Sequence, residues 1–81
     1  MKINFTPPAK RDYTELPVRL QRAVDKQLNF LVDNLRYPSL RAKKYDESQD
    51  IWQGRVNDDY RFYFRIVGEE YRILRIIPHP K

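Results

Sequence analysis

The feature of this sequence that most constrains its fold is a change of hydrophobic period near residue 51. Before that point, apolar residues recur at steps of three or four, whereas after it they alternate with polar residues. Steps of three or four are typical of an amphipathic helix, and alternation is typical of a half-buried strand. The sequence therefore predicts helices in its first half and a β-sheet in its second half.

Two helices are expected in the first half. Residues 6–8 read Thr-Pro-Pro, and threonine is a good N-cap while proline is tolerated in the first turn. This helix is expected to run to about Leu16, and Pro17 then opens a second helix. Tyr37 precedes a proline, which disfavours helical geometry and ends the second helix. Its core-facing stripe comprises Leu20, Val24, Leu28, Leu31 and Leu35.

Four strands are expected, at residues 2–5, 51–57, 60–67 and 71–78. Short polar turns separate the last three strands, so these should pair as antiparallel hairpins. The basic segment 36–44 is expected to be an exposed loop. The fold class is therefore α+β: a small antiparallel sheet of about four strands with two N-terminal helices packed on one face, in the order β-α-α-β-β-β.

Length and composition restrict the class of protein. The 81 residues suffice for one domain, residues 1–81, and the chain has no cysteine and one histidine. Disulfides are therefore excluded and no metal site is expected. No apolar run approaches the roughly 20 residues that span a bilayer, and no signal-peptide pattern opens the chain, so the cytoplasm is expected. The net charge of +5 suits a polyanion such as nucleic acid, although a solvated basic surface would give the same charge.

Alternation divides the strand side chains between the two faces of the sheet. The face expected to pack on the helices carries Trp52, Val56, Phe62, Phe64, Ile66, Leu74 and Ile76. The other face, called the open face below, carries Gln53, Arg55, Asn57, Arg61, Tyr63, Arg65, Ile73, Arg75, Ile77 and His79. It is expected to hold no acidic residue. A bulge would shift this register by one residue, and Gly54 is the expected place for one.

Arginines around a single histidine fit the cleavage of a phosphodiester bond in RNA. That reaction needs a base for the 2′-hydroxyl proton, cations for the charge on the phosphate, and an acid for the leaving oxygen. Alternation along the strands places Arg61, Arg75 and His79 on the same face of the sheet, where they would supply these groups. An open face that is only solvated, or that an acidic protein partner neutralises, would show the same pattern.

Three motifs resemble those of a known family. They are Trp52-x-x-Arg55-Val56, Tyr60-Arg61-Phe62 and Pro78-His79, and together with the helix pair they resemble the RelE/ParE superfamily of toxins from bacterial type II toxin–antitoxin systems. The resemblance spans essentially the whole chain. It implies an mRNA interferase, that is, a ribosome-dependent mRNA endonuclease that stops translation and needs no cofactor or metal. It also implies a cognate acidic antitoxin. The alternatives are a ParE-like inhibitor of DNA gyrase and a non-catalytic RNA- or antitoxin-binding member.

The resemblance also implies roles for individual residues. Arg61 corresponds to the strand arginine that contacts the scissile phosphate, and His79 to the C-terminal histidine that transfers protons. RNA contacts are expected at Lys43, Lys44, Arg55, Tyr63, Arg65, Arg75 and Lys81. Some family members carry further strand lysines and a C-terminal catalytic tyrosine that have no counterpart here. His79 is therefore expected to do more of the proton transfer than in those members.

Overall fold

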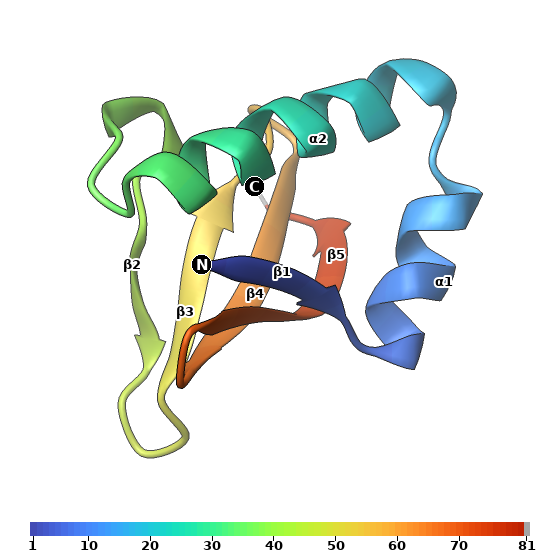
Figure 1. The fold of residues 1–81 in the computed structure, drawn as a ribbon. Helices are drawn as coiled ribbons and strands as arrows, with labels where there is room; N and C mark the ends of the chain where they lie inside the picture. The colour runs from blue at the N-terminus through green and yellow to red at the C-terminus, as the bar shows by residue number, and fades with distance from the viewer. Residues whose placement is uncertain (81) are drawn as a thin grey trace.

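The computed structural model describes residues 1–80, which form two helices, a short 3-10 helix and a five-stranded sheet (Figure 1). The elements are β1 (Lys2–Phe5), α1 (Pro7–Glu15), α2 (Val18–Asp33), η1 (Pro38–Leu40), β2 (Lys43–Asp46), β3 (Ile51–Arg55), β4 (Tyr60–Val67) and β5 (Glu70–Pro78). The strand order is β1-β5-β4-β3-β2. The expected α+β class is confirmed, with one strand more than predicted. Within residues 1–80, neither helix has the length and apolar character that crossing a bilayer requires.

The helices begin as the sequence predicts. The Thr6 hydroxyl accepts a hydrogen bond from the Ala9 backbone N–H at 3.3 Å, and two prolines occupy the first turn of α1. In α2 the predicted stripe is buried as far as Leu31 and packs on the sheet, whereas the helix ends at Asp33, before the predicted boundary. The Asn34 side chain accepts a hydrogen bond from a backbone N–H two residues later, which competes with further helical hydrogen bonds.

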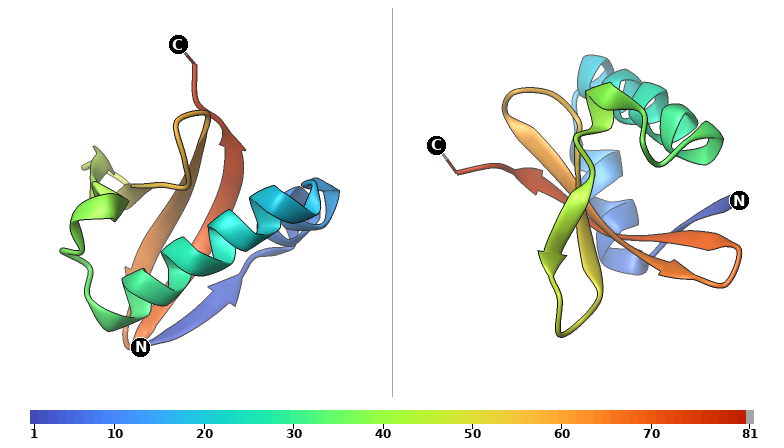
Figure 2. Two further views of the ribbon diagram at one scale, coloured as in Figure 1. Left: turned by 90° about the horizontal axis from the view of Figure 1, so that it is seen from above. Right: turned by 90° about the vertical axis from the view of Figure 1, so that its left-hand side faces the viewer.

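The sheet is mixed, because β1 lies parallel to β5 (Figure 2). Every other pair of neighbouring strands is antiparallel, and for β3–β4 and β4–β5 the hairpin turns predicted this. The parallel pair arises because β1 and β5 are joined through all the other elements, so no hairpin dictates their direction.

The prediction of an exposed loop at residues 36–44 was only partly right, because Arg36, Arg41 and Lys43 are exposed but the segment is not a loop throughout. Leu40 of η1 is fully buried, and the chain then enters β2, which pairs with β3 through Lys43 and Gln53. This strand, whose sequence is Lys-Lys-Tyr-Asp, lies at the edge of the sheet. Short, charged strands are common at sheet edges, and they lack the apolar alternation that reveals a buried strand.

A bulge lies in β5, and the prediction that placed one at Gly54 was wrong. Tyr63 pairs with Arg75 but Phe64 pairs with Ile73, so Leu74 is the extra residue. Ile73 therefore enters the core in place of Leu74, which corrects the predicted faces. On β4, Ile66 was also expected in the core but is 41% exposed.

Gly54 has a different structural role. It pairs with Phe62 across β3 and β4, and the Phe62 ring lies where a Cβ atom at Gly54 would be. Glycine is needed here because the ring packs directly on the backbone. The largest fully buried side chains are Phe62, Phe64, Leu31, Leu40, Ile73 and Val24.

Candidate functional site

A pocket of about 170 Å³, called the basic pocket below, lies beside the last residues of β5. Its lining residues are Arg41, Lys43, Gln53, Arg55, Arg61 and His79, and none of them is acidic. Lys43, Arg55, Arg61 and His79 are residues that the sequence singled out for RNA binding or catalysis. The fold therefore gathers four predicted site residues from three strands and the segment after β5.

Strand register explains this grouping. Lys43 pairs with Gln53 across β2 and β3, and Arg55 pairs with Arg61 across β3 and β4. Cross-strand partners point to the same face of a sheet, so these side chains meet on the open face. Two arginines directly opposite one another repel, and an anion bound between them would relieve that repulsion.

The turn between β3 and β4 holds two groups of the basic pocket. Arg61 donates through Nη1 to the backbone oxygens of Asn57 and Tyr60, the latter at 2.9 Å. The His79 backbone N–H donates to the Asp59 carbonyl oxygen at 2.7 Å. Because carbonyl oxygens carry no net charge, these bonds orient Arg61 without neutralising it. Its remaining N–H groups suit a phosphate.

The His79 imidazole contributes the only buried side-chain nitrogen or oxygen atom in residues 1–80 that lacks a hydrogen-bond partner. This atom is Nδ1. A buried polar atom without a partner costs about 1–3 kcal/mol, so native proteins rarely retain one without a reason. His79 thus combines a buried Nδ1 that lacks a partner with a position on the wall of the basic pocket. Histidine is also the side chain whose ordinary protonation equilibrium lies near neutral pH.

Two of the open-face arginines are paired with carboxylates, which corrects the expectation that this face holds no acid. Asp58 in the turn forms an ion pair with Arg55. Asp12 of α1 binds Arg75 with an Oδ2 to Nε distance of 2.7 Å. Strand parity could not reveal Asp12, because it comes from an element far away in the sequence. Arg61 and Arg65, in contrast, donate to backbone carbonyl oxygens.

Comparison with known proteins identifies the family. A family model described as the ParE toxin of the type II toxin–antitoxin system parDE matches residues 3–80. The chain belongs to the ParE toxin family. It is therefore the toxin of a type II toxin–antitoxin system, as the resemblance to the RelE/ParE superfamily implied. No curated protein sequence matches the toxin.

Solved structures share the toxin's fold. The YoeB/ParE toxin from Agrobacterium tumefaciens has a TM-score of 0.83 at 15% identity, covering 99% of this chain and 100% of that one. The YoeB–YefM complex from Staphylococcus aureus has a TM-score of 0.80 at 16% identity, covering 99% and 98%. The RelBE2 toxin–antitoxin complex from Mycobacterium tuberculosis has a TM-score of 0.72 at 28% identity and 96% coverage of both chains. The predicted fold family is thus confirmed.

Other predicted contact residues of the toxin lie outside the basic pocket. Lys44 lies over the Trp52 ring at 5.3 Å and binds Asp50 at 2.7 Å. Arg65 donates through Nε to the Gln49 carbonyl oxygen at 3.0 Å. Lys81 lies outside the described residues. Lys44 and Lys43 are neighbours in sequence but point to opposite sides of β2, so one of them lines the pocket and the other does not.

Tyr63 was expected to offer a ring for base stacking, yet it is only 9% exposed. It contacts Tyr45 edge-on, with 4.9 Å between ring centroids, and burial raises the pKa of the Tyr63 hydroxyl. Tyr45 is the exposed member of the pair, at 62%. Both line an apolar groove of about 230 Å³ on the open face. In this toxin, stacking on a base would therefore fall to Tyr45.

Two residues of the basic pocket had no predicted role. Alternation placed Gln53 on the open face with the arginines, but no role was predicted for it. Arg41 belongs to the basic segment 36–44, so its charge was the one signal for it. It follows η1 with a left-handed backbone, at φ 45°, which turns the chain into β2. Its position in the toxin depends on how η1 packs under α2, where Gln27 donates to the Ser39 carbonyl oxygen at 3.1 Å.

Proposed function

We propose that this toxin is a metal-independent endoribonuclease that cuts mRNA on the ribosome in the cytoplasm, and so acts as an mRNA interferase. The observation that carries the proposal is the basic pocket, where Arg55, Arg61 and His79 converge and no lining residue is acidic. Such a pocket suits a phosphodiester group: its arginines match the phosphate charge, and its imidazole can exchange a proton.

In the proposed reaction, His79 accepts the proton of a 2′-hydroxyl. The 2′ oxygen forms a bond to phosphorus while the bond from phosphorus to the 5′ oxygen breaks. The leaving 5′ oxygen takes a proton from water, which yields a 2′,3′-cyclic phosphate and a 5′-hydroxyl end. Arg61 stabilises the charge that develops on the phosphate, a contribution worth about 10²- to 10³-fold in rate for a single donor.

The remaining residues of the pocket bind and orient RNA in this proposal. Lys43 and Arg41 attract the backbone by charge, and Gln53 supplies a neutral amide to the same pocket. Arg55 is partly neutralised by Asp58 and acts as a positioning contact. Tyr45 offers its exposed ring to a base at the neighbouring groove.

The proposal includes an acidic antitoxin that covers the basic pocket. The chain carries a net charge of +5, so a negatively charged partner would associate faster and in a salt-dependent way. Two of the matching structures are described as complexes of a toxin with its antitoxin, YoeB–YefM and RelBE2. An association rate that did not change with salt would contradict this part of the proposal.

Brief induction in growing bacteria, followed by mapping of new transcript 5′ ends, tests the proposed function. We expect new ends within translated regions for the wild type, and none for Arg61→Ala or His79→Ala. Arg22→Ala is the matched control, because Arg22 is exposed on α2, away from the basic pocket. New ends that persist in both pocket variants would contradict the proposal.

The family match favours a second candidate, inhibition of DNA gyrase, since the matching family model describes the ParE toxin. A gyrase inhibitor needs no acid–base residue in the pocket. Growth arrest with intact transcripts and inhibited or trapped gyrase would establish this candidate in place of the first. Continued growth with no new transcript ends would instead indicate a non-catalytic member of the fold.

A further inference from the structure

We propose that Asp12 is a positioning residue for His79. From α1 it holds the last part of β5, and this contact fixes where the following segment delivers the imidazole into the basic pocket. The proposal rests on the proposed function only in giving His79 its catalytic role.

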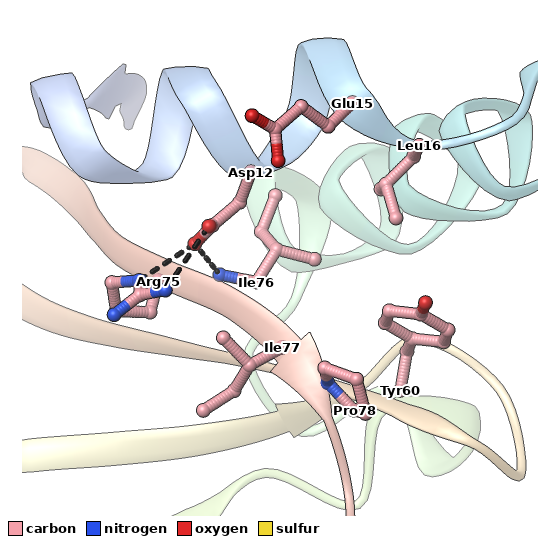
Figure 3. Close-up of a pocket in the computed structure, with 8 residues that line it drawn as sticks. All are labelled: Asp12, Glu15, Leu16, Tyr60, Arg75, Ile76, Ile77 and Pro78. Atoms are coloured by element: carbon pink, nitrogen blue, oxygen red, sulfur yellow. Dashed lines mark hydrogen bonds and ion pairs between the residues drawn. The ribbon is translucent and has the colours of Figure 1, made fainter.

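Asp12 makes three hydrogen bonds to two consecutive residues of β5 (Figure 3). Its Oδ2 atom accepts from the Arg75 Nε at 2.7 Å and from the Ile76 backbone N–H at 2.9 Å. Its Oδ1 atom accepts from the Arg75 Nη2 at 3.1 Å. The Asp12 side chain is only 16% exposed, so water competes little for these bonds. A bidentate arginine pair plus a backbone bond defines the position of this part of β5 in more than one direction.

The contact lies where β5 has lost its outer strand partner. β1 pairs with β5 only as far as Ile73, so the outer edge of β5 beyond that residue faces α1 instead of a strand. The Thr6 hydroxyl donates to the Leu74 carbonyl oxygen at 3.1 Å, and Asp12 then accepts from Ile76. Two side chains of the α1 region thus replace the hydrogen bonds of a missing strand.

The contact also follows the bulge directly. Leu74 is the extra residue of β5, and a bulge bends the strand and changes the direction of the residues after it. Arg75 and Ile76 are the first two residues beyond that bend. His79 lies three residues after Ile76, or roughly 10 Å along an extended chain. Its backbone N–H is held at 2.7 Å from the Asp59 carbonyl oxygen. The stretch between the bulge and His79 is thus anchored at both ends.

The charge of Asp12 supports this arrangement. Burial raises the pKa of the Asp12 carboxyl, but hydrogen bonds from Arg75 and the Ile76 N–H, together with the charges of Arg75 and Arg11, outweigh it and leave the pKa below its ordinary value. Asp12 is therefore a carboxylate throughout the neutral range, with the full charge that a bidentate pair with arginine requires.

His79 is the only histidine of the chain, so its ring gives an unambiguous NMR signal in protein without an added histidine tag. The test compares the His79 ring resonances of the wild type with those of Asp12→Ala and Asp12→Asn. Asp25→Ala is the matched control, because Asp25 is a helical carboxylate that accepts a hydrogen bond from the Tyr13 hydroxyl at 2.9 Å. Cleavage of mRNA on ribosomes is measured for the same four proteins.

We expect Asp12→Ala to shift or broaden the His79 resonances and to lower kcat at least 10-fold with KM within about 2-fold. Asp12→Asn should fall between this variant and the wild type, because an amide oxygen can still accept the Ile76 hydrogen bond. Asp25→Ala should match the wild type. Unchanged His79 resonances in Asp12→Ala would overturn the proposal.

Trp52 fluorescence checks that each variant is folded. If Asp12→Ala is unfolded, Asp12→Asn decides the question by the same resonances. If the wild type cuts no RNA while Asp12→Ala still shifts His79, the proposed function fails but the positioning role stands.

Discussion

The two ends of the open face use arginine for different purposes. At the basic pocket, Arg61 is oriented by backbone carbonyl oxygens and keeps its charge for a ligand. At the outer edge of β5, Arg75 forms a bidentate pair with Asp12 and joins a helix to a strand. Alternation places both arginines on the same face of the sheet. Their roles therefore differ because the tertiary structure brings different hydrogen-bond acceptors to them. The comparison shows that strand position alone does not decide whether an arginine is available to a ligand, because a carboxylate from a distant element can reach it.

The largest expected effect is the difference in RNA cleavage between substitutions of Arg61 and Arg75, one at each end of the open face. We expect Arg61→Ala to lower RNA cleavage about 100-fold or more, because it removes a charged donor aimed at the phosphate. Arg75→Ala should lower cleavage less than 10-fold, since Asp12 keeps its bond to the Ile76 N–H. Cleavage rates on ribosomes, measured beside thermal unfolding curves, provide the comparison. Equal losses for the two variants would show that Arg75 also contacts RNA.

The core beneath β3 and β4, which carry Arg55 and Arg61, can be tested through Gly54. We expect Gly54→Ala to destabilise the toxin by about 1–3 kcal/mol, because the new Cβ would overlap the Phe62 ring and force the core to repack. Urea unfolding measures the loss. Gly68→Ala is the control for a glycine that meets no atoms within 4 Å, although its φ of +59° adds backbone strain. A wild-type unfolding midpoint for Gly54→Ala would show that the ring is free to move aside.

Low pH should reduce the stability that the contact of Asp12 with β5 contributes to the folded toxin. The pKa of Asp12 is below its ordinary value in the folded toxin, so its contribution to stability is complete above the unfolded pKa, about 4, and is lost as the pH falls further. The stability difference between wild type and Asp12→Asn should therefore be largest near neutral pH and shrink at pH 3. Urea unfolding of both proteins at several pH values measures it. The pKa values of Asp46 and Asp50 are also lowered, but both carboxyls are present in the two proteins and cancel in the difference.

The smallest expected effect is a difference in RNA binding between substitutions of two neighbouring lysines, Lys43 and Lys44. We expect Lys43→Ala to weaken RNA binding a few-fold and to reduce the salt dependence by about one phosphate contact, because Lys43 lines the basic pocket. Lys44→Ala should change binding less, since Lys44 is held by Asp50 and the Trp52 ring. Binding of a short RNA over a range of salt concentrations distinguishes them. The opposite order would indicate that RNA passes over the other side of β2.

Local sequence patterns determined the elements whose signal lies within a few residues. The Thr-Pro-Pro start, the apolar stripe of α2 and the hairpins of β3, β4 and β5 are all confirmed. Each depends on a cap, a helical period or a turn, and these act between near neighbours. The same parity placed Arg55, Arg61 and His79 together, and these three do line one pocket.

Tertiary structure decided what depends on contacts between distant segments. The bulge at Leu74 follows from fitting β5 against β4 and the core, and it exchanged Ile73 for Leu74. The charged strand β2 exists because β3 offers it a hydrogen-bonding edge. Asp12 reaches Arg75 across 63 positions of sequence, and no period within one element encodes such a meeting. The sequence by itself thus determined the two helices, the strands with an alternating pattern and the residues with reactive side chains, whereas packing added β2 and selected which of those side chains stay available to a ligand.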